Sequence, residues 1–174
     1  HTTRPQRPGE IEGVNYFFVA SETFQKLQSD GAFFEWAEVF GHCYGTSTAQ
    51  LDARLQQGAD VILEIDWQGA QQVRRLVPDS AWIFILPPSV APLKTRLRDR
   101  GQDTDATIDL RMQAAQDEMS HCDEADYLVI NDVFDTALIE LQAIISAARL
   151  RTGRQQATHT TLLRDLLTPE TPPP

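Results

Sequence analysis

The chain is poor in cysteine and lacks long hydrophobic runs. Its 174 residues include two cysteines, Cys43 and Cys122, too few and too far apart for a disulfide framework or a thiolate metal site. We therefore expect a reducing compartment, and since no secretory signal is visible, the expected location is the cytoplasm. No stretch approaches the ~18 uncharged apolar residues that a membrane span requires. The chain opens at His1 instead of a methionine, so we expect that an N-terminal segment is missing.

Lysine is also scarce, and basic residues are outnumbered by acidic ones. Fifteen basic residues against 25 acidic residues give a net charge of −10, which argues against nonspecific binding to nucleic acid or to an anionic membrane. All the basic residues except Lys26 and Lys94 are arginine. Arginine offers a rigid two-pronged donor for phosphate or carboxylate, whereas lysine does not. The bias indicates either anion recognition or only a GC-rich genome and a soluble surface, and the positions of the arginines must decide.

The apolar content of 41% rules out a disordered chain and predicts one globular domain with room for a small subdomain. From residue 59 onward, apolar runs of strand length alternate with helical periodicity. The predicted elements are strand 60–65, helix 68–76, strand 81–86, a helix through Leu93 and Leu97, a helix from about 106, strand 127–130 and helix 134–150. Buried strands that alternate with helices are typical of a parallel sheet covered on both faces, so the expected class is α/β.

Residues 1–58 have a different pattern, which predicts a small mixed α+β subdomain. Aromatic-rich segments of strand type, 16–19 and 33–39, flank a short helix at 22–28. A second helix, 48–57, ends at Gly58. We expect this subdomain to be followed by the α/β core over residues 59–167 and by a frayed, Pro-rich tail over residues 168–174.

Two groups of arginines have spacings that suit the binding of an anion. Arg4 and Arg7 lie in the extended segment Arg-Pro-Gln-Arg, where two guanidinium groups that converge on one point would hold a phosphate. Arg96 and Arg100 lie four residues apart, on one face of a helix, and Arg111 lies on the next helix. The alternative for each group is a solvated basic surface.

Three carboxylates stand at positions that suggest a role in binding. Glu64 and Asp66 are two residues apart, so their side chains point the same way at the carboxyl end of a predicted strand, where open α/β sheets bind ligands. They would suit a magnesium-bound nucleotide or the recognition of a base; the alternative is that Asp66 only caps the following helix. Glu35 interrupts the apolar run Phe-Phe-Glu-Trp, so it must face solvent or meet a pair of donors.

Six motifs, in order and in register, resemble those of guanylate kinase in its bacterial form. They are TTRPQRPGEIEGVNYFFV, EWAEVFGHCYGT, LEIDWQGAQQVR, IFILPPS, RLRDRGQD and YLVIND, within a match that runs from His1 to about Arg154. The resemblance implies a P-loop kinase fold with a GMP-binding subdomain at 1–58 and a helical lid at about 94–121. It also implies that the γ-phosphoryl group of ATP, bound with Mg²⁺, is transferred to GMP, giving GDP and ADP.

The resemblance also implies a role for each matching residue. The residues that resemble the family's binding site for the GMP phosphate are Arg4, Arg7, Tyr16 and Tyr44. Both tyrosines could also be ordinary core aromatics. The residues that would read guanine are Glu35, Thr46 and Asp66. The lid arginines that would stabilise the transferring phosphoryl group are Arg96, Arg100 and Arg111. Glu64 matches a position near the Mg²⁺ shell where some relatives carry Asp, and Asn131 matches the lining of the adenine pocket.

The chemistry of guanine agrees with these roles. Guanine presents N1–H and the 2-amino group as adjacent donors, which a buried carboxylate such as Glu35 can accept, and the Thr46 hydroxyl can donate to O6. Adenine presents the opposite pattern, and such sites discriminate by about 10⁴-fold or more. No general base is expected, because phosphoryl transfer depends on positioning and on electrostatic stabilisation.

The sequence contains no G-x-x-x-x-G-K-[ST] loop, whose backbone and lysine would hold the ATP phosphates. We therefore expect the chain by itself to be inactive. The alternative is a catalytically inert guanylate-kinase-like module that recognises a phosphopeptide, which we disfavour because the guanine and lid positions are intact. The expected partners are GMP and ATP, without nucleic acid or membrane, and a homo-oligomer stays open.

Overall fold

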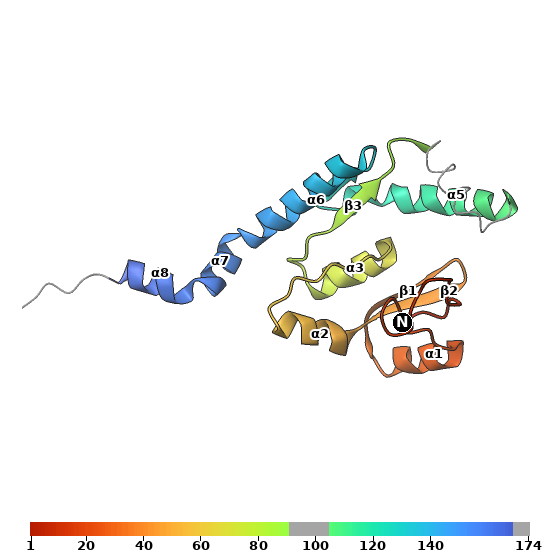
Figure 1. Ribbon diagram of the computed structural model, residues 1–174, viewed down its shortest axis with the longest axis horizontal. Helices are drawn as coiled ribbons and strands as arrows, with labels where there is room; N and C mark the ends of the chain where they lie inside the picture. The colour runs from red at the N-terminus through yellow and green to blue at the C-terminus, as the bar shows by residue number, and fades with distance from the viewer. Residues whose placement is uncertain (91–104, 169–174) are drawn as a thin grey trace, which may run out of the picture. The chain divides into compact units, whose positions relative to one another are not determined.

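A computed structural model describes residues 1–90 and 105–168. The chain divides into two compact units, His1–Trp82 and Ile83–Pro174. The first unit contains α1 (Ser21–Ser29), β1 (Phe33–Val39), β2 (His42–Ser47), α2 (Thr48–Gln56) and α3 (Trp67–Leu76). The second contains β3 (Ile83–Leu86), α5 (Asp105–Ser120), a 3₁₀ turn (Cys122–Glu124), β4 (Tyr127–Ile130), α6 (Phe134–Arg149), α7 (Thr152–Thr158) and α8 (Thr160–Leu167) (Figure 1).

The first unit is built on an antiparallel hairpin of β1 and β2. Phe40 and Gly41 form its two-residue turn, with φ of 51° and 74°, and positive φ at both positions is what such a turn requires. The pairing runs from Val39 opposite His42 to Phe33 opposite Ser47, with one irregularity near Phe33. This register puts an acidic residue of β1, Glu35, directly across from a hydroxyl residue of β2, Thr46.

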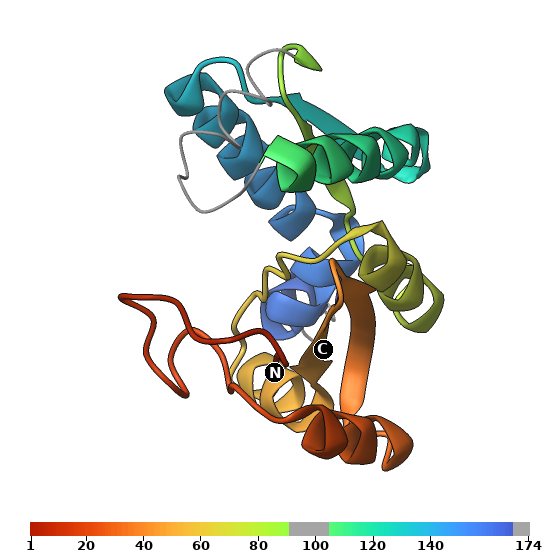
Figure 2. The same cartoon turned by 90° about the vertical axis from the view of Figure 1, so that its right-hand side faces the viewer.

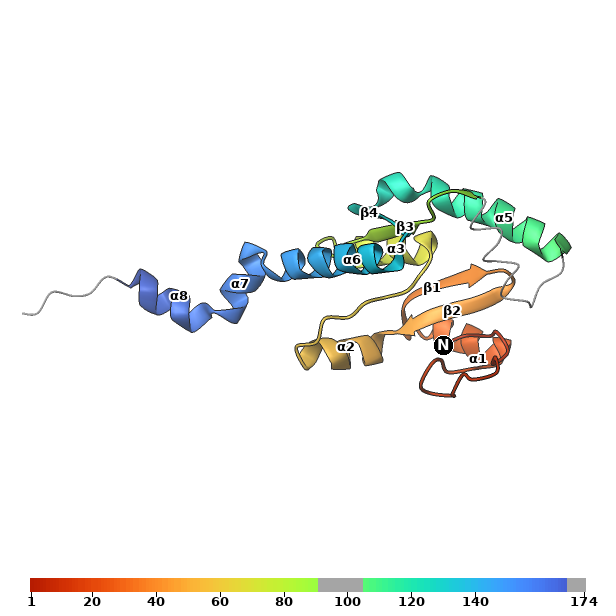
Figure 3. The same cartoon turned by 45° about the horizontal axis from the view of Figure 1, so that its top comes forward.

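Three helices pack on this hairpin. Helix α1 buries Phe24, whose ring lies 4.6 Å from that of Phe33. Helix α2 begins after Ser47, whose side chain accepts a hydrogen bond from the backbone of Gln50, and contacts both strands. Helix α3 packs along β1, as Figure 3 shows. The core of this unit therefore lies between the hairpin and these helices.

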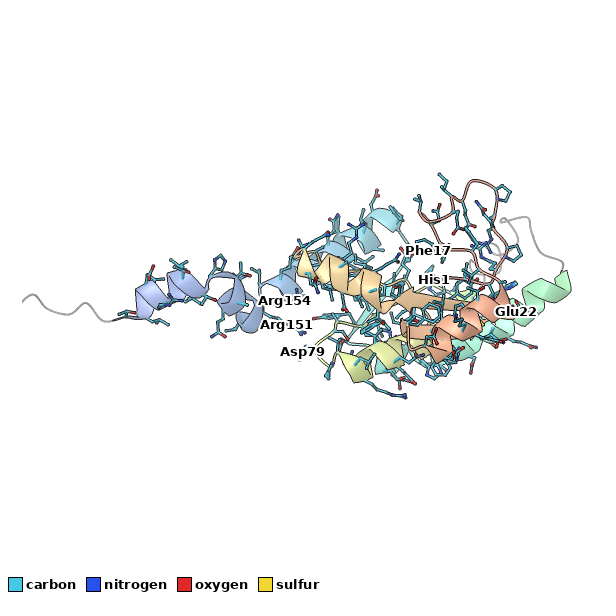
Figure 4. The ribbon with its side chains drawn as sticks, turned by 90° about the horizontal axis from the view of Figure 1, so that it is seen from below. His1, Phe17, Glu22, Asp79, Arg151 and Arg154 are labelled. Atoms are coloured by element: carbon cyan, nitrogen blue, oxygen red, sulfur yellow. The ribbon has the colours of Figure 1, made fainter. Side chains whose placement is uncertain are left out.

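The N-terminal residues are tied into the same unit. Thr2 is fully buried; its N–H donates to the carbonyl of Phe17, and its own carbonyl accepts from the N–H of Val19, both at 2.9 Å. The N–H of Thr3 donates to the carbonyl of Cys43 in β2. The ring of His1 stacks on Phe17 with centroids 4.9 Å apart (Figure 4). The chain between these ties makes an excursion, drawn in red in Figure 2, and returns.

The second unit contains a parallel pair of strands. Ile83 pairs with Tyr127 and Leu86 with Ile130, so β3 and β4 run in the same direction, with α5 in the connection between them. Helix α6 packs against β4, and Phe84, Val129 and Ala137 are buried. A parallel strand pair joined through a helical connection confirms the α/β class that the alternation of apolar runs predicted.

The prediction of a strand at 60–65 is wrong. The segment has no regular secondary structure and pairs with no strand among residues 1–90 and 105–168, and Ile62 is 72% exposed. An apolar run becomes a strand only where it lies beside the edge of another strand, and no strand among the described residues offers such an edge here. The other predicted strand-type segment, 16–19, makes single bridges instead of a regular strand: Phe18 pairs with Thr2 and Tyr16 with Glu12.

Strand β2 was not predicted, and the other elements follow the predicted order. Helices α1, α2, α3 and α6 lie within two residues of their predicted bounds, and α5 starts at Asp105. The helix predicted through Leu93 and Leu97 lies outside the described residues. The short helices α7 and α8 replace what was predicted only as the end of the core. Among the helices that the structure describes, none has the length and apolar content to cross a membrane.

Candidate functional site

The first unit holds a buried carboxylate with a hydroxyl partner. Strand β1 places Glu35 at 4% exposure, and the Thr46 hydroxyl across the hairpin donates to Glu35 Oε1. Burial raises the pKa of Glu35 above its usual value, the hydrogen bond from Thr46 opposes that shift, and the charge of Asp66 adds to it. A buried carboxylate that keeps free lone pairs is an acceptor for donors on a ligand.

Asp66 lies at the start of α3, and its expected capping of that helix is confirmed. Its Oδ1 accepts from the N–H of Gly69 at 2.9 Å, and its Oδ2 accepts from Nε2 of Gln68 at 3.0 Å, so the side chain caps the helix. Because each carboxylate oxygen has a second lone pair, the cap leaves Asp66 able to accept from a ligand as well. The N–H of Gly69 donates to Asp66, and a β-carbon at position 69 would lie 2.6 Å from Oε2 of Glu35, so both carboxylates lie beside the same residue.

Helix α3 is fastened to the strand that carries Glu35. The amide nitrogen of Gln72 donates to the carbonyl of Trp36 at 2.7 Å, and the N–H of Trp36 donates to the amide oxygen of Gln72 at 3.3 Å. One side chain thus satisfies both backbone groups of the residue that follows Glu35. The first turn of α3 is therefore held at a fixed place beside this carboxylate.

Arg4 is the centre of a second polar cluster. The residue is 8% exposed, and its two terminal nitrogens donate to the two carboxylate oxygens of Glu10, at 2.7 and 3.1 Å. The guanidinium carbon lies 5.5 Å from the centre of the Tyr16 ring, and the rings of Tyr16 and Tyr44 meet edge to face at 6.2 Å. The hydrogen bond to Glu10 is the main reason that the pKa of Arg4 is raised, and Arg4 in turn lowers the pKa of Glu10.

Comparisons with known proteins agree with the resemblance found in the sequence. Residues 1–148 match the family model described as Guanylate kinase. The guanylate kinases of Legionella pneumophila (strain Lens) and Escherichia coli (strain K12) are 54% and 53% identical to the chain over 167 residues, covering 96% of the chain and 80% and 81% of those proteins. The chain belongs to the guanylate kinase family. The crystal structure of guanylate kinase from Anaplasma phagocytophilum matches with a TM-score of 0.78 at 35% identity, covering 95% of this chain and 79% of that one.

Family membership confirms the resemblance and the P-loop kinase fold that it implied. Of the residues predicted to grip the GMP phosphate, the structure brings Arg4, Tyr16 and Tyr44 together. Arg7 is exposed, and its backbone N–H donates to Glu10 at 2.7 Å. The three predicted guanine readers, Glu35, Thr46 and Asp66, also lie in this first unit.

Five further residues were predicted for the site: Arg96, Arg100, Arg111, Glu64 and Asn131. Arg96 and Arg100 lie outside the described residues, as does the side chain of Arg111, whose backbone is in α5. Glu64 is exposed, two residues before the cap of α3. Asn131 follows β4, and its N–H donates to the carbonyl of Leu86 at 2.8 Å. Among the residues that the structure describes, no group of three or more His, Cys, Asp or Glu side chains could hold a metal ion.

Three contacts of this site were missed by reasoning from the sequence. Glu10 follows Arg7 by three residues and Arg4 by six, so an acidic residue beside two predicted phosphate ligands was a signal that could have been used. Gly69 and Gln72 had no such signal, because their contacts with β1 depend on how α3 packs.

Proposed function

We propose that the chain provides the GMP-binding part of a guanylate kinase, which transfers the γ-phosphoryl group of ATP to GMP and forms GDP and ADP. The observation that carries this proposal is the buried Glu35, paired with Thr46 and next to Asp66. Two close carboxylates form an acceptor-rich site, which suits the paired N–H donors of guanine and not the donor–acceptor edge of adenine. The relatives that carry the name guanylate kinase support the same reaction.

Guanine would bind through this acceptor surface. Glu35 would accept from N1–H and from the 2-amino group, and Asp66 would accept from the 2-amino group while it keeps its cap on α3. The Thr46 hydroxyl donates its proton to Glu35, so it can donate to guanine O6 only after turning away from the carboxylate. We therefore assign Thr46 first to the positioning of Glu35.

The phosphate of GMP would bind at the cluster around Arg4. The terminal nitrogens of Arg4 donate to Glu10 and, at 2.7 Å, to the carbonyl of Pro5, which fixes the guanidinium plane. A phosphate oxygen would bind at the N–H groups that these two partners do not use. The exposed Arg7 would supply a second guanidinium, and Tyr16 and Tyr44 would supply phenol donors. A dianion favours such paired arginines, because charge-assisted hydrogen bonds are the stronger ones.

We further propose that residues 1–58 form the GMP-binding subdomain and residues 59–167 the core, with a lid at about 94–121. Two supports for Glu35, the Asp66 cap and α3, come from beyond residue 58, so the guanine site draws on both sides of that boundary. In the lid, Arg96, Arg100 and Arg111 would stabilise the charge on the transferring phosphoryl group. Asn131, which follows β4, would line the adenine pocket.

Magnesium fits the residues near α3 as an ion held jointly with the nucleotide. Mg²⁺ usually binds one or two carboxylates and takes its other ligands from water and substrate phosphates, so the lack of a three-ligand cluster among the described residues is compatible with it. Glu64, exposed just before α3, would contribute the carboxylate. When bound, the ion would neutralise charge on the phosphates of ATP.

We also propose that these 174 residues turn over no GMP by themselves, because the sequence contains no G-x-x-x-x-G-K-[ST] loop. A coupled assay of GDP formation tests this proposal, with the same chain joined to the phosphate-loop segment of a relative as the positive control. Turnover by the chain alone would contradict it, and failure of the joined chain to turn over would contradict the assigned reaction.

Titration calorimetry with GMP and AMP tests substrate recognition separately from turnover. We expect GMP to bind the chain more tightly than AMP. Equal affinities would contradict the guanine site. The alternative function, an inert module that binds a phosphopeptide, predicts phosphopeptide binding with no preference for GMP, so a phosphoserine peptide belongs in the same titration series.

A further inference from the structure

The first turn of α3 contains a glycine that its backbone conformation does not require. Gly69 is helical and does not have the positive φ seen at five other glycines. Glycine inside a helix is less stable than alanine, so a helical glycine calls for a packing reason. Gly69 is also buried, on the side of α3 that faces the carboxylate of Glu35.

The packing reason for a glycine at position 69 is that the Glu35 side chain occupies the space a β-carbon would need. A β-carbon at position 69 would lie 2.6 Å from Oε2 of Glu35, closer than real β-carbon contacts come, and 3.2 Å from the β-carbon of Ile65. Oε1 of the same carboxylate is engaged by the Thr46 hydroxyl on the opposite side. The carboxylate is therefore held between a hydroxyl and a bare helix turn.

Neither partner can move away easily. Asp66 caps the first turn of α3 at Gly69 N–H, and one turn later Gln72 binds both backbone groups of Trp36, next to Glu35. A methyl group added at position 69 would thus have to displace the Glu35 side chain, because Gln72, three residues after Gly69, fastens the helix to Trp36, the residue that follows Glu35.

We propose that Gly69 is a specificity-determining positioning residue, which sets the place of the guanine-reading carboxylate by leaving room for it. This inference rests on the proposed function of Glu35 and adds the residue that limits where its oxygens can lie. Gln72 supports the same arrangement by fixing the distance between α3 and β1.

The test is a pair of glycine-to-alanine variants of the 174-residue chain. Gly69→Ala adds a methyl group against Glu35, whereas Gly153→Ala adds one within helix α7, where nothing lies within 4 Å. We expect Gly69→Ala to weaken GMP binding by about tenfold or more, the loss of roughly one hydrogen bond to a charged group, and to leave AMP binding unchanged. Gly153→Ala should bind GMP as the parent chain does.

A second pair of variants shows whether Gly69 acts through Glu35. In a Glu35→Ala background the carboxylate is gone, so Gly69→Ala should have no further effect on GMP binding. If Gly69→Ala alone fails to fold while the double variant folds, the clash with Glu35 is supported. If both fail to fold, the neighbour that matters is not Glu35, and the inference is overturned.

The results also separate this inference from the proposed function. A parent chain that binds GMP and AMP equally overturns the guanine site itself. A parent chain that prefers GMP, together with a folded Gly69→Ala variant whose GMP affinity is within twofold of the parent, overturns only the role of Gly69.

Discussion

Replacing the buried carboxylate by its amide, Glu35→Gln, separates what this site does for binding from what it costs in stability. The amide has almost the same size as the carboxylate and can still accept a hydrogen bond from the Thr46 hydroxyl through its oxygen. The change removes the negative charge and turns one of the two acceptor atoms into a donor. The packing against Gly69 and the pairing of β1 with β2 should therefore survive.

GMP binding should fall substantially in this variant. Guanine would meet an N–H₂ group where it now meets a carboxylate oxygen, so one charge-assisted bond is lost and two donors face each other. Hydrogen bonds to charged groups contribute about 1.5–3 kcal/mol, which corresponds to roughly a 10- to 150-fold loss of affinity. AMP lacks these donors, so its binding should not weaken.

Folding stability should change in the opposite direction. Burial raises the pKa of Glu35, so in the folded state its ionised form is disfavoured relative to the unfolded chain. An acid with a raised pKa contributes stability below its unfolded-state pKa, and this contribution is lost as the pH rises through the folded-state pKa. Glutamine does not titrate. We therefore expect Glu35→Gln to be at least as stable as the parent chain at pH 7 and to lose that advantage in acid.

Two assays decide the matter. Titration calorimetry with GMP at pH 7 measures the binding loss, and thermal unfolding from about pH 4 to 7, around and above the ordinary glutamate pKa, measures the stability difference. A variant that binds GMP as well as the parent would refute the reading of guanine by Glu35. A variant with normal circular dichroism that is less stable than the parent at pH 7 would refute the idea that the buried charge is costly.

Further predictions concern the groups around this carboxylate. Asp66→Ala should lower the free energy of unfolding of the first unit by about 1 kcal/mol in denaturant titrations, because α3 loses its cap, whereas Asp66→Asn should keep most of it. Because Arg4 lowers the pKa of Glu10, their ion pair should stabilise the chain above the ordinary glutamate pKa and lose that effect as the pH falls through the lowered value. Glu10→Gln should therefore have a lower Tm than the parent at pH 7, a difference that shrinks in acid, whereas Glu35→Gln should be at least as stable as the parent at pH 7. Phe24→Ala should lower the free energy of unfolding by about 3–5 kcal/mol, since Phe24 is 1% exposed and packs on Phe33. GMP binding should be lost under conditions where the first unit unfolds.

Local signals in the sequence were sufficient to predict several elements. Strand β1 and helices α2 and α3 have short apolar patterns ended by turn or cap residues, and Asp66 before α3 is a cap by composition alone, whereas strand β2 was not predicted. These features depend on residues within a few positions of each other, so the sequence contains the information directly.

Other features depend on partners that a local pattern does not show. The run 60–65 has the composition of a buried strand, but whether it forms one depends on a neighbouring strand, and none of the described residues provides it. The bonds between Arg4 and Glu10 require the N-terminal excursion to fold back on itself. The closeness of Gly69 to Glu35 depends on the packing of α3 against β1, which periodicity predicts only as a buried face.

The most direct test of the guanine site compares GMP with inosine 5′-monophosphate, which is GMP without the 2-amino group, on the parent chain and on Glu35→Gln. If the carboxylate accepts from that amino group, the parent chain should prefer GMP by roughly tenfold or more, the worth of one hydrogen bond to a charged group. The preference should shrink in Glu35→Gln, because only the Asp66 carboxylate then remains as a charged acceptor for the amino group. A preference of the same size in both proteins would contradict the account, since it would mean that Glu35 does not read the 2-amino group.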